Sequence, residues 1–163
     1  MNFKPLKSDE NILILPGAQV LGDVTAGEGT SFWFNSVCRA EKVPVVIGKR
    51  CNVQDLAVIH NRCVIGDDVS VGHSAIVHGS VVEDGVLVGM HATLMNGCVI
   101  GKGSIVAAGA LVKEGQIIPP GSLAVGVPAK VLRPVSEEQR QQILRDAAHY
   151  VEQAEKHKKE IVV

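Results

Sequence analysis

The chain has 163 residues, enough for one domain with a hydrophobic core of its own. Its formal net charge is −1, from 16 Lys+Arg and 17 Asp+Glu, so the composition provides no basic surface for nucleic acid or an anionic membrane. No apolar run approaches a membrane span, and the first residues, MNFKPLKSDE, lack the apolar stretch of a secretory signal. We therefore expect a cytoplasmic protein without nucleic-acid or membrane partners, whose four cysteines are free thiols.

An aliphatic residue recurs every six positions through most of the chain. The series runs through Ile47, Val53, Ile59, Ile65, Val71 and Val77 and, after a slip of one residue, through Val82, Val88, Leu94, Ile100, Val106, Val112 and Ile118. In the stretch from about Ile12 to Val46 the same pattern of aliphatic residues recurs less regularly. A period of six is typical of a parallel β-helix, with one short strand and one turn in each repeat. Three repeats would close a triangular coil of about 18 residues, with the aliphatic side chains inside and successive coils about 4.8 Å apart.

A small or β-branched residue stands four positions after each aliphatic residue of the series from Ile47 to Val106. Three of the four cysteines, Cys51, Cys63 and Cys98, occupy this position. We interpret them as small buried side chains at the corners of the coils rather than as reactive groups.

The repeats are expected to end near Val131, where prolines become frequent. A helix is predicted to begin at Ser136, because S-E-E-Q is a capping box in which Gln139 answers Ser136. An apolar stripe at helical spacing follows, made of Ile143, Leu144, Ala147, Val151 and Ala154. We thus predict an all-β fold, a parallel β-helix over residues 1–133, with a C-terminal α-helix in residues 134–163 packed along it.

Three of the six histidines, His60, His73 and His78, lie close together in the sequence. His60 and His78 are 18 residues apart, so a coil of that length stacks them on one outer face, where two imidazoles can share one metal ion. His73 belongs to another side of the triangle, too far away in the same chain for metal–nitrogen bonds of about 2.0–2.1 Å. We infer a metal site between subunits, completed by His73 of a neighbour and repeated at each interface of a trimer.

Surface exposure without metal binding is the alternative interpretation of these three histidines, and their spacing alone leaves both open. His149 and His157 lie on the predicted helix, where solvated side chains are expected. His91 is expected in a surface turn.

An ordered set of motifs runs along nearly the whole chain. It comprises SFWFNSVCRAE (31–41), IGKRCNVQD (47–55), VIH (58–60), VGHSAIVHG (71–79) and VGM (88–90). In this order the motifs resemble those of the gamma-class carbonic anhydrases, in a short bacterial form. The resemblance implies a left-handed β-helix that forms a homotrimer, with a divalent metal held between subunits by His60, His73 and His78. It also implies reversible hydration of carbon dioxide to bicarbonate by a metal-bound hydroxide, with zinc, or else iron(II) or cobalt, as the metal.

The same resemblance assigns roles to four further residues. Arg39 matches an arginine that pairs with carboxylates near the interface, and Asp55 is its natural partner. Gln54 matches the residue that hydrogen-bonds the water on the metal. Tyr150 lies on the predicted helix, where the family often brings a hydroxyl to the active site; simple packing is the alternative.

The chain departs from the family's motifs at several positions, among them those of two family glutamates, one of which shuttles protons. Glu41 stands where the family commonly has aspartate, and Lys42 replaces a glutamate. The acidic loop after the first ligand is missing, since His60 is followed at once by Asn61 and Arg62. We therefore expect slow proton export and a low turnover.

Two other functions stay open at this point. One is a hexapeptide acyltransferase that uses an acyl coenzyme A, with His91 or His73 as the general base. The other is a metal-bearing trimeric scaffold with weak catalysis, in which the metal ties the subunits together.

Overall fold

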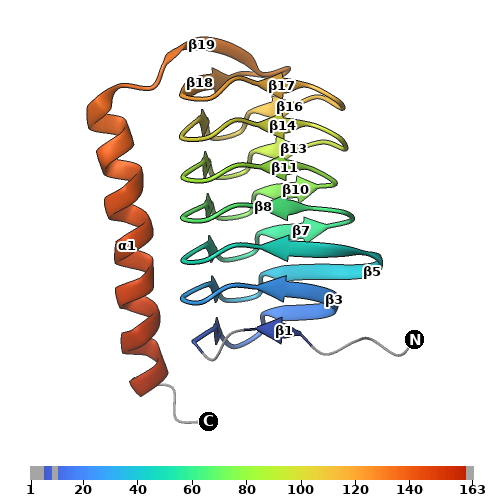
Figure 1. Ribbon diagram of the computed structural model, residues 1–163, viewed down its shortest axis with the longest axis vertical. Helices are drawn as coiled ribbons and strands as arrows, with labels where there is room; N and C mark the ends of the chain where they lie inside the picture. The colour runs from blue at the N-terminus through green and yellow to red at the C-terminus, as the bar shows by residue number, and fades with distance from the viewer. Residues whose placement is uncertain (1–5, 9–10, 161–163) are drawn as a thin grey trace.

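The computed structural model describes residues 6–8 and 11–160. The chain winds as a parallel β-solenoid of about six turns, and one helix, α1 (Glu137–Glu160), lies along its side (Figure 1). The expected parallel β-helix with a C-terminal helix is therefore confirmed. Of the two predicted regions, residues 1–5, 9–10 and 161–163 lie outside the described residues.

Short parallel strands build three faces of the solenoid. The histidine face contains β7 (Val58–His60), β10 (Ile76–His78), β13 (Thr93–Leu94) and β16 (Leu111–Val112). The aliphatic face contains β1 (Lys7–Ser8), β8 (Val64–Ile65), β11 (Val81–Val82), β14 (Val99–Ile100) and β17 (Ile117–Ile118). The helix face contains β2 (Leu13–Ile14), β4 (Ser31–Phe32), β6 (Asn52–Val53), β9 (Ser70–Val71), β12 (Leu87–Val88), β15 (Ile105–Val106) and β18 (Ser122–Val125).

Two longer strands, β3 (Gln19–Ala26) and β5 (Val37–Ile47), run around the corner between the histidine face and the aliphatic face. The start of β5 pairs with β7, and its end pairs with β8. These strands account for the less regular repeats before Val46, because each long strand here takes the place of two short strands and the turn between them. Glu41 and Lys42 lie at this corner within β5, next to the histidine face.

The core consists of the inward aliphatic residues of the repeat. On the histidine face, Ile59, Val77 and Leu94 stack in register and are fully buried. All four cysteines are free and buried; for Cys51, Cys63 and Cys98 this burial agrees with their position in the repeat. Burial raises the pKa of the Cys38 and Cys51 thiols to about 12, so both are held as unreactive thiols.

The solenoid ends differently from its repeats. The last parallel strand is β18, and β19 (Lys130–Pro134) then returns antiparallel to it. The parallel coils thus stop at Val125, earlier than the predicted end near Val131, because the chain reverses through a turn around Pro128.

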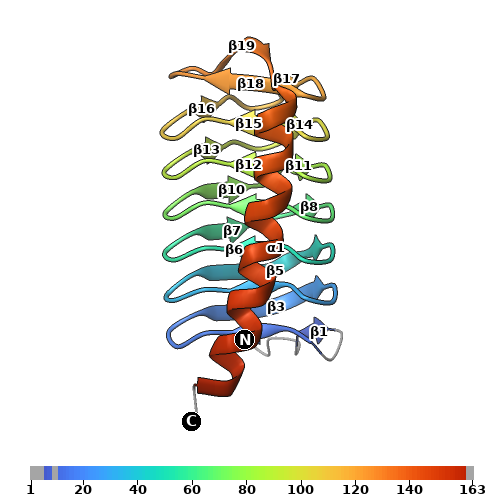
Figure 2. The same cartoon turned by 90° about the vertical axis from the view of Figure 1, so that its left-hand side faces the viewer.

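The capping box of α1 forms as predicted. The Ser136 backbone N–H donates to Gln139 Oε1, and the Gln139 N–H donates to Ser136 Oγ, each at 3.2 Å. The helix descends over the helix face, antiparallel to the rise of the coils (Figure 2). In the described part of the chain, no helix has the length and apolar character to cross a membrane.

The apolar stripe of α1 is narrower than predicted. Its residues Ile143, Ala147 and Ala154 are buried, and Val151 is half-buried. Leu144 is instead 49% exposed, because the helix contacts the solenoid through a narrow row of residues that does not include it.

Candidate metal centre

His60 and His78 occupy adjacent rungs of the histidine face. They are register partners on β7 and β10, as their spacing of 18 residues predicts. Their ring centroids are 5.0 Å apart, and His60 Nδ1 lies 3.0 Å from His78 Nε2. Both side chains are half-buried and follow an inward aliphatic residue. We call this pair the strand half-site.

The outer nitrogen of each imidazole in the strand half-site faces an oxygen. His60 Nε2 lies 3.1 Å from Glu41 Oε2, and His78 Nδ1 lies 2.8 Å from Asn96 Oδ1. Carboxylate and amide oxygens only accept hydrogen bonds, so these two nitrogens carry the protons. The two unprotonated nitrogens of the neutral rings are then the pair that face each other at 3.0 Å. Two nitrogen lone pairs at this distance repel each other, and a metal ion between them could bind to both.

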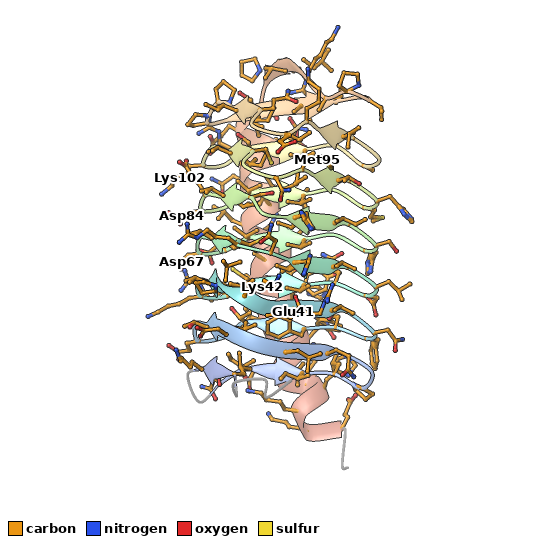
Figure 3. All side chains as sticks on the ribbon, turned by 90° about the vertical axis from the view of Figure 1, so that its right-hand side faces the viewer. Glu41, Lys42, Asp67, Asp84, Met95 and Lys102 are labelled. Carbon is orange, nitrogen blue, oxygen red and sulfur yellow. The ribbon has the colours of Figure 1, made fainter. Side chains whose placement is uncertain are left out.

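Glu41 joins the strand half-site to a charged hollow of about 690 Å³, which Arg39, Lys42 and Asn61 also line. The hydrogen bond from His60, and the charge of Arg39, hold the pKa of the Glu41 carboxyl below its usual value. Glu41 is thus an anion that accepts from both groups. Figure 3 looks onto the side away from α1 and shows Glu41 and Lys42 there together with Met95.

Arg39 forms its ion pair with Glu41 in this chain, two residues further on in β5. Its expected partner, Asp55, instead contacts His73. The predicted Arg39–Asp55 pair is therefore not formed within one chain, because the two residues lie on different sides of the solenoid. A pair between neighbouring chains stays a prediction.

His73 stands at the turn between the helix face and the histidine face. His73 Nδ1 lies 2.9 Å from Asp55 Oδ2, and the His73 side chain is 41% exposed. With Gln54 and Tyr150 it lines a cavity of about 470 Å³ under α1. We call His73, Asp55, Gln54 and Tyr150 the helix half-site.

A chain of buried hydrogen bonds orients Gln54 in the helix half-site. Gln54 is buried, and its Nε2 donates to Asn52 Oδ1 at 2.9 Å. Asn52 Nδ2 in turn donates to Ser70 Oγ at 2.8 Å. This bond engages one N–H of the Gln54 amide and sets the orientation of the amide, whose oxygen can then accept from a ligand.

Tyr150 enters the cavity from the helix. Its ring packs edge-on against Trp33, with ring centroids 5.1 Å apart. Burial, and then the nearby charges of Asp55 and Asp146, raise the pKa of its hydroxyl. The hydroxyl is therefore a neutral donor in the cavity, and the structure gives it both a packing role and access to the helix half-site.

The two half-sites are separate within one chain. In residues 6–8 and 11–160, no three His, Cys, Asp or Glu side chains meet closely enough to hold a metal ion. The strand half-site lines one hollow, and His73 lines another. The inference that His73 is out of reach of His60 and His78 in the same chain agrees with this arrangement.

The other histidines are placed individually. His91 is exposed in a turn, and His149 is exposed on α1 at the rim of the cavity. The expectation that His157 is simply solvated is wrong: its ring packs edge-on against Trp33, with centroids 5.5 Å apart, and is only 31% exposed.

The three imidazoles suit a transition-metal ion. Each has one nitrogen against an oxygen acceptor, namely Glu41, Asp55 or Asn96, as is usual for ligand histidines. This arrangement fixes which nitrogen of each ring is free to bind. The donor set of neutral nitrogens fits zinc, iron(II) or cobalt.

Asn96 was not found from the sequence. It is 18 residues after His78, but the intervening coil is one residue shorter, so Val77 pairs with Leu94 and periodicity places Met95 opposite His78. Asn96 follows in the next turn and turns its amide back towards the ring. The spacing of 18 residues between His78 and Asn96 therefore does not predict their contact, because the coil between them is one residue short.

Comparison with known proteins places this arrangement in a family. The sequence profile of the GMPPB C-terminal domain family matches residues 36–130. The "Uncharacterized transferase YtoA" of Bacillus subtilis is 52% identical over 149 residues, covering 89% of this chain and 87% of that protein. A "Carbonic anhydrase" of Geobacillus kaustophilus is 41% identical over 143 residues, covering 85% and 79% of the two chains. The chain belongs to the GMPPB C-terminal domain family and to the hexapeptide-repeat transferase/gamma carbonic anhydrase-like family.

Solved structures agree with this family assignment. A hexapeptide transferase family protein from Anaplasma phagocytophilum superposes with a TM-score of 0.90 at 34% identity, covering 92% of this chain and 91% of that one. The gamma carbonic anhydrase-like family thus includes proteins named for two different activities, and the family alone does not choose between them.

Proposed function

We propose that this protein is a metal-dependent carbonic anhydrase that hydrates carbon dioxide reversibly to bicarbonate as a homotrimer. The observation that carries the proposal is the set of three imidazoles, each with one nitrogen bonded to an oxygen acceptor and the other free. An acyltransferase base needs one such histidine, whereas a metal centre needs the set. The 41% identical carbonic anhydrase supports the same choice.

The metal would lie between the strand half-site of one chain and the helix half-site of the next. Apolar side chains flank both half-sites: Leu56 and Met90 near His73, and Ile76 and Met95 on the histidine face, each 40–58% exposed. Burying these side chains against a second copy would favour association at this place. The proposed site is complete only when the subunits are assembled.

A bound zinc, iron(II) or cobalt ion would lower the pKa of a water molecule towards neutrality. The chain's own groups would then orient and deprotonate that water. Gln54 would accept a hydrogen bond through its amide oxygen, because the bond from its Nε2 to Asn52 sets the orientation of the amide. Tyr150 would donate its neutral hydroxyl to the bicarbonate oxygen.

Proton export would pass through Glu41 on the other side of the site. Its carboxylate accepts from His60 and opens to the charged hollow, so it can pass protons to solvent buffer. The hydrogen bond from His60 and the charge of Arg39 lower the pKa of Glu41, however, and make it a weak base. A low turnover that rises with buffer concentration is therefore expected.

Carbon dioxide hydration, metal content and mass measured on one sample test the proposal. We expect a particle of about three times 17.2 kDa that contains one metal per chain and hydrates carbon dioxide in a stopped-flow assay. His60→Ala should lose both metal and activity. His91→Asn, which changes an exposed histidine in a turn, is the matched control and should keep both. A metal-loaded trimer with no activity above that of His60→Ala would contradict the proposal and favour the scaffold.

Acyl transfer is the second candidate, because the 52% identical relative is named a transferase. In that case coenzyme A or acetyl coenzyme A should raise the melting temperature, and a chelator should not alter this effect. The same chelator should abolish carbon dioxide hydration if the first proposal holds.

A further inference from the structure

Asn96 is the least expected partner among the three oxygen acceptors that face the histidines. It lies in the turn after β13, one coil beyond His78, and nothing in the periodic pattern selects it. Its Oδ1 is 2.8 Å from His78 Nδ1, a short contact for two neutral groups.

The orientation of the Asn96 amide is set by a second residue. Asn61 Nδ2 donates to the same Asn96 Oδ1 at 3.3 Å, from the corresponding turn beside His60. An oxygen that already accepts from one amide is an acceptor for the ring as well. His78 must therefore place its proton on Nδ1, which leaves Nε2 unprotonated.

Gly79 creates the space that this contact needs. A Cβ atom at Gly79 would lie 2.2 Å from Asn96 Oδ1 and 3.4 Å from Asn61 Nδ2. Gly79 also has a positive φ of 61°, which a side chain disfavours. The backbone beside Asn96 is held as well, because Gly97 N–H donates to Gly79 O at 2.7 Å.

We propose that Asn96 is a positioning residue that fixes His78 in the Nδ1-protonated form, so that Nε2 is presented as the free donor of the strand half-site. The role of that donor in binding a metal rests on the proposed function above; the protonation pattern itself does not. Glu41 and Asp55 are anions and can attract a proton, whereas Asn96 is neutral and acts only by accepting a hydrogen bond.

Nitrogen NMR of the metal-free full-length protein tests the proton position directly. Spectra that correlate ring nitrogens with ring protons are recorded at about pH 8, where imidazole is ordinarily neutral. His78, assigned by its loss in His78→Ala, should carry its proton on Nδ1 in the wild type. In Asn96→Ala the free imidazole preference for Nε2–H should take over. Asn96→Asp should restore the Nδ1–H form, since a carboxylate accepts in the same place.

Zinc affinity, measured by competition with a chromophoric chelator, tests the consequence. Asn96→Ala should bind zinc about 10- to 100-fold more weakly than the wild type, while Asn96→Asp should stay within a few-fold of it. Gly79→Ala should reproduce the loss, because its methyl group displaces the Asn96 amide. Glu114→Ala changes an exposed residue of the following coil and is the matched control, which should alter neither readout.

The two readouts separate the failure of this inference from the failure of the proposed function. A wild-type His78 protonated on Nε2, or an Asn96→Ala spectrum identical to that of the wild type, would overturn the role of Asn96. A wild type that keeps the Nδ1–H form but binds no zinc would instead overturn the proposed metal centre and leave the positioning role standing.

Discussion

The strand half-site and the helix half-site both contain histidines next to oxygen acceptors, but different parts of the fold hold them in place. The strand half-site is built on the rungs of the solenoid, where His60 and His78 are register partners in a parallel ladder. The helix half-site depends on a packing contact, because Tyr150 reaches its cavity only when α1 lies against Trp33. Ladder hydrogen bonds fix positions along the whole solenoid, whereas a helix held by a thin apolar line can be displaced. The comparison teaches that the strand half-site is supported by the ladder of the solenoid, whereas part of the helix half-site is supported by the packing of α1.

The largest effect is expected from mixing subunits that lack different half-sites. His60→Ala and His73→Ala trimers should each bind no metal, because every interface then misses one ligand. Trimers that contain both chains, purified through two different tags, should recover one complete site, at the interface where intact His60 meets intact His73.

Metal content of the purified trimers, measured by elemental analysis, checks this prediction. Trimers made from two differently tagged His73→Ala chains are the control and should stay empty. Recovery in the control, or no recovery in the mixture, would show that the two half-sites do not join between chains.

Trp33→Ala should weaken the support of the helix half-site. Trp33 is buried, donates from Nε1 to Ser31 Oγ at 2.9 Å, and packs against Tyr150 and His157. We expect a loss of about 3–5 kcal/mol in the free energy of unfolding, measured with denaturant. The NMR signals of His78 should be unchanged, and a shift there would mean that the two half-sites are coupled.

Gln54→Leu should affect turnover without emptying the site. It removes the acceptor oxygen while keeping most of the side-chain volume, so kcat/KM for carbon dioxide should fall about 10- to 100-fold, the equivalent of one hydrogen bond to a charged reacting group. Metal content should match that of the wild type. An unchanged kcat/KM would remove Gln54 from the proposed mechanism.

The smallest effect concerns the titration of Tyr150. Because this is the single tyrosine, the absorbance of tyrosinate reports on it alone. Burial and the charges of Asp55 and Asp146 oppose ionisation, so the midpoint should lie above the ordinary value of about 10. Asp146→Asn should lower the midpoint part of the way, and denaturant should return it to the ordinary value. A midpoint at or below that value in the folded protein would mean that the hydroxyl is solvated.

The regular part of the fold followed from the sequence. A period of six fixes which residues point inward, and from it the stacking of His60 on His78 could be derived. The capping box likewise placed the start of α1, because both of its hydrogen bonds are local in sequence.

The irregular parts could not be derived in this way. The pairing of Arg39 with Glu41 depends on how β5 rounds a corner, and the contact of Asn96 depends on a coil that is one residue short. The packing of His157 depends on the angle at which α1 crosses the solenoid. Each of these is a consequence of tertiary geometry that no periodic pattern encodes.

The reversed strand β19 has a consequence for self-assembly. A stack of parallel rungs has an open upper end, to which another molecule's rung could add and start a fibre. On the helix face that edge is occupied by a strand of opposite direction that ends in Pro134, which has no N–H to offer. A second solenoid therefore cannot continue the parallel ladder on all three faces, which disfavours end-to-end stacking.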